Sequence, residues 1–285
     1  MSRRAIGWLA AMALLSPLAA TAQEGDVWTL RAMELSNGVL KAQWMDIRIE
    51  QVELLSLHQP RRISRLHWQP FQWVPGDPRR PAGGSQLTYL VDRTEGPRAA
   101  EVPDSVETAV DRAVASWARL GCSPLELVKR PDTGEDADIF DFHLGFGGLG
   151  NWQTADVVFG GWMPPSFFEA VAGQGAGTTV LAMSVTFIFV GSDGVPTDID
   201  GDQHFDTAVN EIYFNDGFSW QGESCFDVET VALHEIGHSL GLGHFEYPPR
   251  AVMNPVYTGS RRELSARDRA LACSVWASWQ SNPEQ

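Results

Sequence analysis

One run of eleven residues, 234–244, constrains this chain more than any other part of it. It reads His-Glu-Ile-Gly-His-Ser-Leu-Gly-Leu-Gly-His and fits the pattern H-E-x-x-H-x-x-G-x-x-H at every fixed position. His234 and His238 are four residues apart, so a helix places both on one face. Gly241 can then end that helix and let the chain turn His244 towards the same point. Three imidazoles with a fourth position open to water form the ligand set of a catalytic zinc ion.

Glu235 directly follows the first of these ligands. From there its carboxylate can reach a water on the metal without binding the metal itself, which is where a general base belongs. A bare H-E-x-x-H also occurs in ordinary surface helices, but here a glycine and a third histidine follow at the required offsets. The run therefore predicts a zinc-dependent hydrolase.

A second segment supports this interpretation. Met253 comes nine residues after His244, in the run Ala-Val-Met-Asn-Pro-Val-Tyr. This run resembles the Met-turn, which places a methionine beneath the three histidines of metzincin proteases. It is most similar to the form found in matrixins, the matrix-metalloprotease branch. The resemblance covers residues 85–280 and implies that Pro255 and Tyr257 form a wall of the pocket for the substrate residue after the cut bond.

The resemblance implies an α+β fold of the metzincin type. Its catalytic domain would have a twisted, mostly parallel sheet, a long helix, the zinc helix, and a small C-terminal subdomain with the Met-turn and a closing helix. It also makes residues 211–215 the edge strand along which substrate lies antiparallel. Apolar spacing predicts the long helix over 106–120, and β-rich runs predict strands at 47–57, 86–91, 125–128, 138–144 and 179–190.

Three segments are expected along the chain. Residues 1–22 have two arginines, an apolar run and a small-residue cleavage site, as in a signal peptide. Residues 23–84 form an extension that ends in a linker rich in proline and glycine, and residues 85–285 form the protease domain. The extension is either a removed propeptide or a retained structural subdomain. Matrixin propeptides block the zinc with a cysteine, but the first cysteine here is Cys122, which excludes that device.

The net charge of the chain limits the kinds of molecule that it can bind. The chain has 36 acidic and 21 basic side chains and a formal net charge of −15, so its surface repels nucleic acid and anionic membranes. No apolar run is long enough to be a membrane anchor. We expect a protein or peptide substrate, a monomer, and a secreted or periplasmic location after cleavage near Ala22 and Gln23.

Three cysteines in an exported chain suggest one disulfide and one cysteine left over. Cys122 follows the predicted long helix and Cys273 lies in the predicted closing helix. This placement resembles a disulfide of the astacins, another metzincin branch, and therefore favours the pair Cys122–Cys273. Pairing of Cys225 with Cys273 remains open.

An acidic loop forms a second candidate site. Its aspartates occupy relative positions 1, 3, 5 and 9, as in the early part of a calcium loop, although position 12 is a valine. The loop also resembles a matrixin segment in which a histidine binds a second, structural zinc and the last aspartate binds calcium. We expect calcium here; a second zinc at His204 and a solvated acidic loop remain alternatives. The four aspartates are Asp198, Asp200, Asp202 and Asp206.

The function that these observations favour is a secreted zinc endopeptidase in which Glu235 is the general base. One alternative is a non-catalytic secreted binding module on the same fold. Another is a zinc hydrolase that acts on a non-peptide amide. Because Glu235 and all three histidines are present, the sequence favours an active enzyme.

Overall fold

The fold is described from a computed structural model of the chain. The described residues are 30–31, 46–57, 70–77, 79–80, 86–93, 103–148, 155–191, 193–220 and 225–279. The predicted signal peptide and its cleavage site lie outside these ranges.

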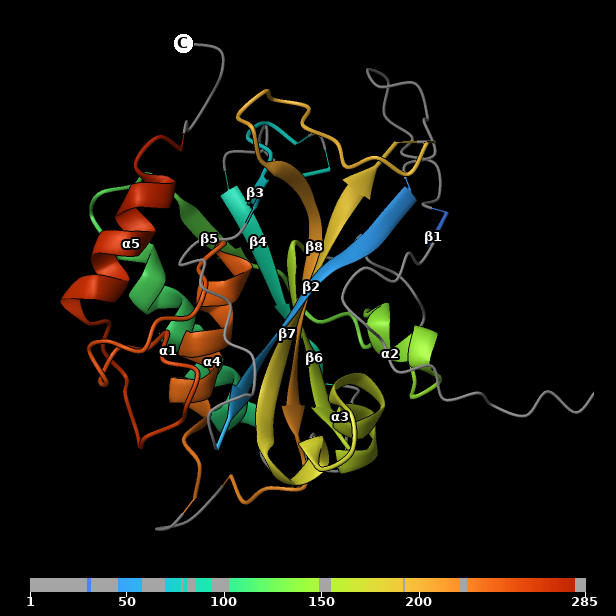
Figure 1. Cartoon of the computed structure of the whole chain (residues 1–285), viewed down its shortest axis with the longest axis vertical. Coiled ribbons are helices and arrows are strands. Elements are labelled where there is room, and N and C mark those ends of the chain that lie inside the picture. Colours follow the sequence, from blue (N-terminus) through green and yellow to red (C-terminus); the bar gives the residue numbers. More distant parts are fainter. Residues whose placement is uncertain are drawn as a thin grey trace, which may run out of the picture.

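One eight-stranded sheet runs through the centre of the molecule (Figure 1). Its strand order is β1-β2-β7-β8-β6-β4-β5, and β3 pairs with β8 off this path. The strands β5, β4, β6 and β8 are parallel to one another, whereas β7 is antiparallel to both of its neighbours. The bounds are β1 Leu30–Arg31, β2 Asp46–Ser56, β3 Phe71–Trp73, β4 Gln86–Val91, β5 Glu126–Lys129, β6 Val157–Met163, β7 Val180–Val190 and β8 Phe205–Asn215.

Helices cover both sides of the sheet. In Figure 1, α1, α4 and α5 gather on one side, and α2 and α3 lie on the other. This arrangement confirms the α+β class expected from the sequence, and it places the motif helix, α4, between the sheet and two further helices. The bounds are α1 Pro103–Ala118, α2 Phe140–Leu144, α3 Pro165–Ala172, a 3-10 turn Ala176–Thr178, α4 Val228–Ser239 and α5 Ala266–Trp276.

Alternation along the strands divides the interior into two apolar cores. In β8, Ile212 and Phe214 join the core beneath α1, α4 and α5, while Tyr213 joins the core beneath α2 and α3. Successive side chains of a strand point to opposite faces, so a strand covered on both faces must be apolar along its length. All residues of β7 are buried for this reason.

The structure confirms the strand at 86–91 and the long helix, but the strand predicted at 138–144 is wrong. These residues instead form the short helix α2. Glu211 of β8 accepts hydrogen bonds from the backbone N–H groups of Ile139 and Phe140, at 2.7 and 3.0 Å. A carboxylate bound to the first N–H groups stabilises a helix start, and Gly145 ends the helix with a φ of 79°. A hydrogen-bonding partner that is distant in sequence, Glu211, therefore overrides the local residue pattern that predicted a strand.

The expectation that residues 211–215 form an edge strand is also wrong. They belong to β8, which has β7 on one side and β6 on the other. The strand beyond β8 is β7, and its outer side is paired with β2 from the N-terminal extension. The extension thus contributes strands to the same sheet as the predicted protease domain.

The described part of the proline- and glycine-rich linker also packs against this domain. Arg80 is 5% exposed and its Nε lies 2.8 Å from Asp156 Oδ1. Arg79 Nη1 donates to the carbonyl of Ala208 at 2.9 Å and is paired with Asp77. Burial of both guanidinium groups with these partners fixes the segment that leads into β4.

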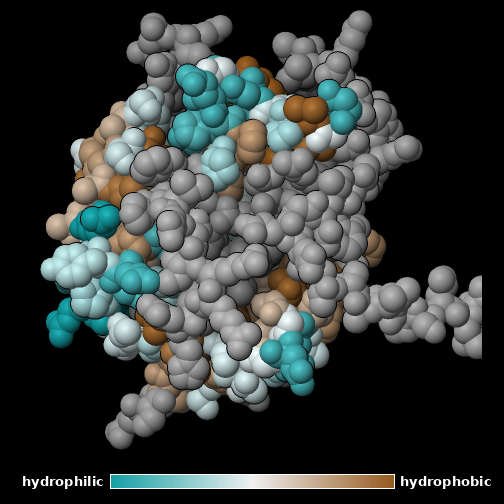
Figure 2. Space-filling model, in the orientation of Figure 1, coloured by the Kyte–Doolittle hydropathy of each residue, from teal (hydrophilic) through white to brown (hydrophobic). Residues whose placement is uncertain are grey.

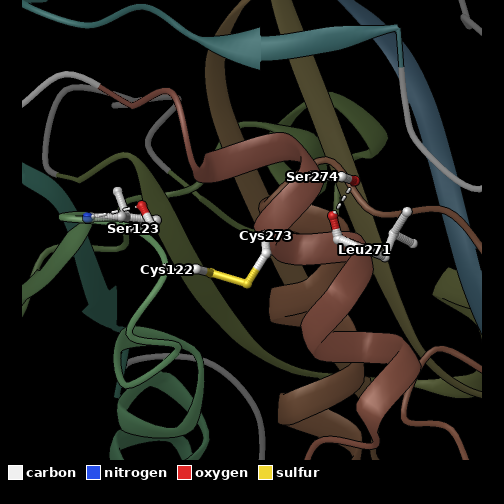
Figure 3. Close-up of a disulfide and its surroundings, with 6 residues drawn as sticks. Cys122, Ser123, Leu271, Cys273 and Ser274 are labelled. Carbon is white, nitrogen blue, oxygen red and sulfur yellow. Dashed lines mark hydrogen bonds between the residues drawn. A yellow bond between two sulfur atoms is a disulfide. The ribbon is translucent and has the colours of Figure 1, made fainter.

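A disulfide joins Cys122 to Cys273, with Cα atoms 5.7 Å apart. Figure 3 shows this bond between the chain just after α1 and the middle of α5. The pairing favoured by the resemblance is the one that forms, and Cys225 lies outside it. Among the described helices, none combines the length and the apolar character needed to cross a membrane.

Candidate metal centre

The helix α4 carries the first two histidines of the motif. Asp227 caps its start by accepting a hydrogen bond from Thr230 N at 3.1 Å, as expected for an N-cap aspartate. The helix is buried almost throughout and ends at Ser239. Gly241 then adopts a φ of 80°, the left-handed conformation that glycine takes at low cost. The chain therefore turns where the sequence predicts.

The three histidines converge through one ring nitrogen each. The Nε2 atom of His234 lies 3.0 Å from that of His238 and 3.1 Å from that of His244. The remaining pair, His238 and His244, is also 3.1 Å apart. All three residues are at most 4% exposed. Three acceptor nitrogens this close, without an intervening donor, form a ligand triangle for a metal ion.

Backbone carbonyls fix two of the rings from the opposite side. His234 Nδ1 lies 2.6 Å from the carbonyl of Val252, and His238 Nδ1 lies 2.8 Å from the carbonyl of Leu242. A carbonyl can only accept, so Nδ1 carries the proton and the Nε2 lone pair faces the triangle. Burial lowers the pKa of His234 well below its usual value, and the neighbouring histidines add to this effect. The ring is therefore neutral, as a ligand must be.

Glu235 lies in the same buried turn of α4, one residue after His234 and three before His238, and is 0% exposed. A carboxylate is rarely buried to this degree without a function or a compensating partner. Its position next to the ligand triangle is the one expected for a general base.

Met253 lies in the turn predicted beneath the histidines and is 0% exposed. It packs against α4 at Gly237, a residue that the sequence reasoning did not single out. A Cβ at Gly237 would lie 2.2 Å from Met253 Sδ and 3.1 Å from Trp117 Cζ2. Only glycine allows this approach, so the second variable position of H-E-x-x-H is constrained by packing.

Asp268 of α5 holds the same turn from the other side. Its carboxylate is 0% exposed and accepts hydrogen bonds from the N–H groups of Val252 and Met253, at 3.0 and 3.1 Å. It also accepts from Ser265 N at 2.7 Å, which closes the capping box of α5. The closing helix thereby fixes the carbonyl that orients His234.

Three tryptophans fix the middle and the end of α4, which the sequence reasoning also missed. Their indole N–H groups donate to three backbone carbonyls at 2.8 to 2.9 Å. The tryptophans come from β3, α1 and α5, so three distant elements hold one helix. The high tryptophan count of the chain, 11, was the available signal. The pairs are Trp73 with Ser239, Trp117 with Leu233, and Trp276 with Leu240.

A pocket opens beside His234. Tyr257 lines this pocket, whereas Pro255 is buried and is not among the lining residues. The ring of Tyr257 packs edge-on against Phe226, and its hydroxyl accepts a hydrogen bond from Asp227 N at 3.2 Å. The full lining is Leu55, Thr230, His234, Ala251, Val252, Asn254, Val256, Tyr257, Thr258, Gly259 and Arg261.

Comparison with known proteins agrees with this geometry. The family model for matrixins, Peptidase_M10, matches residues 179–276. The match spans β7, β8, the three histidines, the Met-turn and α5. This part of the chain is therefore similar to the matrixin branch of the metzincins.

Relatives in plants and mammals cover different shares of the chain. Metalloendoproteinase 2-MMP of Arabidopsis thaliana is 25% identical over 212 residues, which are 71% of this chain and 44% of that protein. Matrilysin of Rattus norvegicus is 34% identical over 113 residues, 40% of this chain and 36% of that protein. Matrix metalloproteinase-25 of Homo sapiens is 42% identical over 76 residues, 25% of this chain and 12% of that protein. The chain thus spans less than half the length of these relatives.

The acidic loop between β7 and β8 brings three of its four predicted aspartates together. Asp198, Asp200 and Asp206 each offer an oxygen within 4.8 Å of the others. Asp202 is not part of this group, and its Oδ1 accepts a hydrogen bond from the N–H of His204 at 2.8 Å. In the described ranges His204 joins no group of three metal-binding side chains. The loop runs along the upper rim of the face in Figure 2, where hydrophilic residues gather.

A second acidic group, which the sequence reasoning did not identify, is buried beneath α2. Asp138, Asp141 and Glu211 are each 0% exposed. Burial raises the pKa of Asp138, and the adjacent Asp141 and Glu211 raise it further. Burial likewise raises the pKa of Glu211 to about 8, although Glu211 accepts hydrogen bonds from two backbone N–H groups and the Tyr213 hydroxyl. Asp92, Asp136 and Asp138 also offer oxygens within 4.8 Å of one another.

Proposed function

We propose that the protein is a zinc-dependent endopeptidase. The observation that carries this proposal is the convergence of three neutral imidazoles through Nε2, with Glu235 buried next to them. The residues fit the metal: the donors are nitrogen, two rings are oriented by carbonyls, and three protein ligands leave one position for water. We propose His234, His238 and His244 as the ligands.

The chain's own groups have defined tasks in this reaction. Bound zinc would lower the pKa of a water and polarise the scissile carbonyl. Glu235 takes the proton of the attacking water on its carboxylate and later delivers it to the leaving amine. Tyr257, with the other lining residues, binds the side chain that follows the cut bond. Val252 and Leu242 hold the imidazoles in the required tautomer through their carbonyls.

The test is metal removal and return. A quenched fluorescent peptide should be cleaved by the purified protein, should survive after chelation, and should be cleaved again after one equivalent of zinc is added. His238→Ala should stay inactive with zinc, while His204→Ala, outside the ligand triangle, should recover like the wild type. Tight zinc binding without cleavage of peptides or proteins would instead favour the binding-module alternative, and cleavage confined to small amides would favour the non-peptide hydrolase.

We propose that the acidic loop binds calcium through Asp198, Asp200 and Asp206. Support comes from their mutual distance and from the preference of calcium for carboxylate oxygens. Asp206→Asn should abolish a calcium-dependent rise in melting temperature, and Asp202→Asn is the matched control that should keep it. An equal loss in both variants would reject this ligand set. We do not propose a second zinc at His204, because His204 belongs to no group of three candidate ligands among the described residues.

We also propose that the chain is exported and that it consists of three segments. The disulfide supports an oxidising compartment, outside the cell or in a periplasm. Residues 1–22 would be the signal peptide, residues 23–84 the extension and residues 85–285 the protease domain. Sequencing the N-terminus of the protein recovered from its producing cells tests the first boundary, and a start at Met1 would reject it.

A further inference from the structure

Three carboxylates meet inside the protein near the end of β4. Asp92 directly follows β4, and Asp136 and Asp138 lie in the segment that leads into α2. Each of the three offers one carboxylate oxygen within 4.8 Å of the other two. Asp92 and Asp138 are 6% and 0% exposed. This group is therefore buried, unlike the acidic loop, in which Asp198 and Asp200 are exposed.

Backbone N–H groups hold two of these carboxylates in place. Asp92 Oδ2 accepts a hydrogen bond from Ala137 N at 3.1 Å, and Asp136 Oδ2 accepts one from Gly148 N at 2.7 Å. The other oxygen of Asp136, Oδ1, is buried without a hydrogen-bond donor. The chain before and after α2 is thus fixed to the end of β4, and one oxygen of this carboxylate is left over.

Asp138 is the residue that points to a ligand. Both of its carboxylate oxygens are buried, and neither has a hydrogen-bond donor. A Cβ at Gly160 of β6 would lie 2.5 Å from Asp138 Oδ2, so only glycine lets this oxygen approach the strand so closely. An ionised carboxylate buried without a partner costs on the order of several kcal/mol. A positive charge within the group would remove this cost.

The donor atoms decide which cation fits. All three candidate ligands are carboxylates, and the group contains no histidine or cysteine. Oxygen ligands suit hard cations such as calcium and magnesium, whereas protein zinc sites are built mainly from nitrogen and sulfur ligands. Calcium accepts about six to eight oxygens in a flexible geometry, and a carboxylate can supply one or two of them. Magnesium keeps several of its waters, so a buried group of carboxylates with unused oxygens fits calcium better.

We propose that Asp92, Asp136 and Asp138 bind a calcium ion inside the protein. The ion joins the end of β4 to the segment before α2, and it offsets the charge of an acidic group that also contains Asp141 and Glu211. All three ligands precede residue 179, where the match to the matrixin model begins. The inference does not depend on the proposed peptidase function.

The test measures calcium binding by the full chain with Glu235→Ala and Asp206→Asn, stripped with a chelator and reloaded with one equivalent of zinc. Glu235→Ala prevents self-cleavage during the titration, and Asp206→Asn removes the calcium expected at the acidic loop. In this parent protein, Asp138→Asn removes the charge of one ligand at nearly the same volume. Glu135→Gln is the matched control, because it removes one charge from an exposed position in the same segment.

We expect isothermal titration with calcium chloride to show one site in the parent and in the Glu135→Gln protein. In the Asp138→Asn protein calcium should bind at least about tenfold more weakly, which corresponds to about 1.4 kcal/mol, and the calcium-dependent rise in melting temperature should be lost. Hydrogen exchange of the amides of residues 136–145 should slow with calcium only in the first two proteins. In calcium-free buffer the Asp138→Asn protein should be no less stable than the parent, so the loss is specific to the ion.

A second variant keeps the test valid if the Asp138→Asn protein does not fold. Asp92→Asn, at the end of β4, should weaken calcium binding in the same way. A parent that neither binds calcium nor gains stability from it would overturn the inference, because the carboxyls of Asp138 and Asp141 would then share a proton instead. Equal calcium affinity in the parent and in both aspartate variants, or magnesium bound as tightly as calcium, would also overturn it.

Discussion

At the proposed metal centre, the histidine rings are positioned by contacts on the side that faces away from the metal site. The ligand rings are oriented by the carbonyls of Val252 and Leu242, and Asp268 fixes the N–H groups of the Met-turn. A ligand held by such a second set of contacts keeps its ring orientation before metal binds. The contact between Gly237 and Met253 is the tightest point of this arrangement.

Gly237→Ala tests that contact. The added Cβ would lie 2.2 Å from Met253 Sδ, so either the buried Met253 side chain or the helix must shift. We expect the free energy of unfolding to fall by about 1–3 kcal/mol, as for other overpacked cores, and zinc affinity to fall with it. The control is Gly237→Ala with Met253→Ala, in which the smaller side chain leaves room. Urea unfolding should show that the double variant loses less than the sum of the two single variants; strict additivity would contradict a direct clash.

At the residue scale, the convergence of His234, His238 and His244 could be predicted from their spacing because a helix has a fixed period. The same reasoning could not find Gly237, because its constraint comes from a methionine 16 positions later in the chain. Nor could it show that Asp202 stays outside the group that the other three aspartates form. These outcomes depend on tertiary distances.

Elements are positioned by buried polar contacts as well as by apolar packing. The helix α2 illustrates this: alternation predicted a strand, but Glu211 of β8 binds the N–H groups at its start. The error about β8 also has a tertiary cause, because β7 and β6 pair with it on either side and the local pattern of a strand does not reveal its neighbours. Strands with strong local patterns, such as Gln86–Val91, were predicted with their bounds.

The buried acidic group makes stability depend on pH. A carboxyl whose pKa is raised on folding favours the folded state below its unfolded pKa, about 4, and this contribution is lost as the pH rises through the folded pKa. Asp138 is such a group. Asp138→Asn should therefore gain stability relative to the wild type from pH 5 to pH 8, by up to about 1.4 kcal/mol per pH unit. Denaturant unfolding at each pH, in calcium-free buffer, measures the difference in the free energy of unfolding between the two proteins. Glu135→Gln, at an exposed position, is the control for the loss of one negative charge. A difference that becomes smaller as the pH rises would contradict the prediction.

At the scale of the whole molecule, contacts between distant parts of the chain hold the fold together. The extension pairs with β7, three tryptophans from separate elements hold α4, and the disulfide joins residues 151 positions apart. Composition predicted one disulfide in an exported chain, and only the resemblance favoured this pair. That β2 would lie beside the metal centre could not be read from the sequence, because the extension has no ligand or motif that identifies its partner.

The disulfide should stabilise the whole fold. Reduction frees a loop of about 150 residues in the unfolded chain, so Cys122→Ser with Cys273→Ser should lower the free energy of unfolding by about 2–5 kcal/mol. Cys225→Ser, which leaves the bond intact, is the matched control. Denaturant unfolding should separate the two proteins; an equal stability would mean that the bond does not constrain the unfolded chain.

The central claim is that Glu235 acts on a water held at the histidine triangle. The most direct measurement compares the wild type with Glu235→Gln, each loaded with one zinc by elemental analysis, in a quenched-peptide assay. Because glutamine has the same shape but cannot take a proton, kcat should fall by about 10² to 10⁴ while the zinc content stays at one. Wild-type cleavage by the zinc-loaded Glu235→Gln protein would contradict the account.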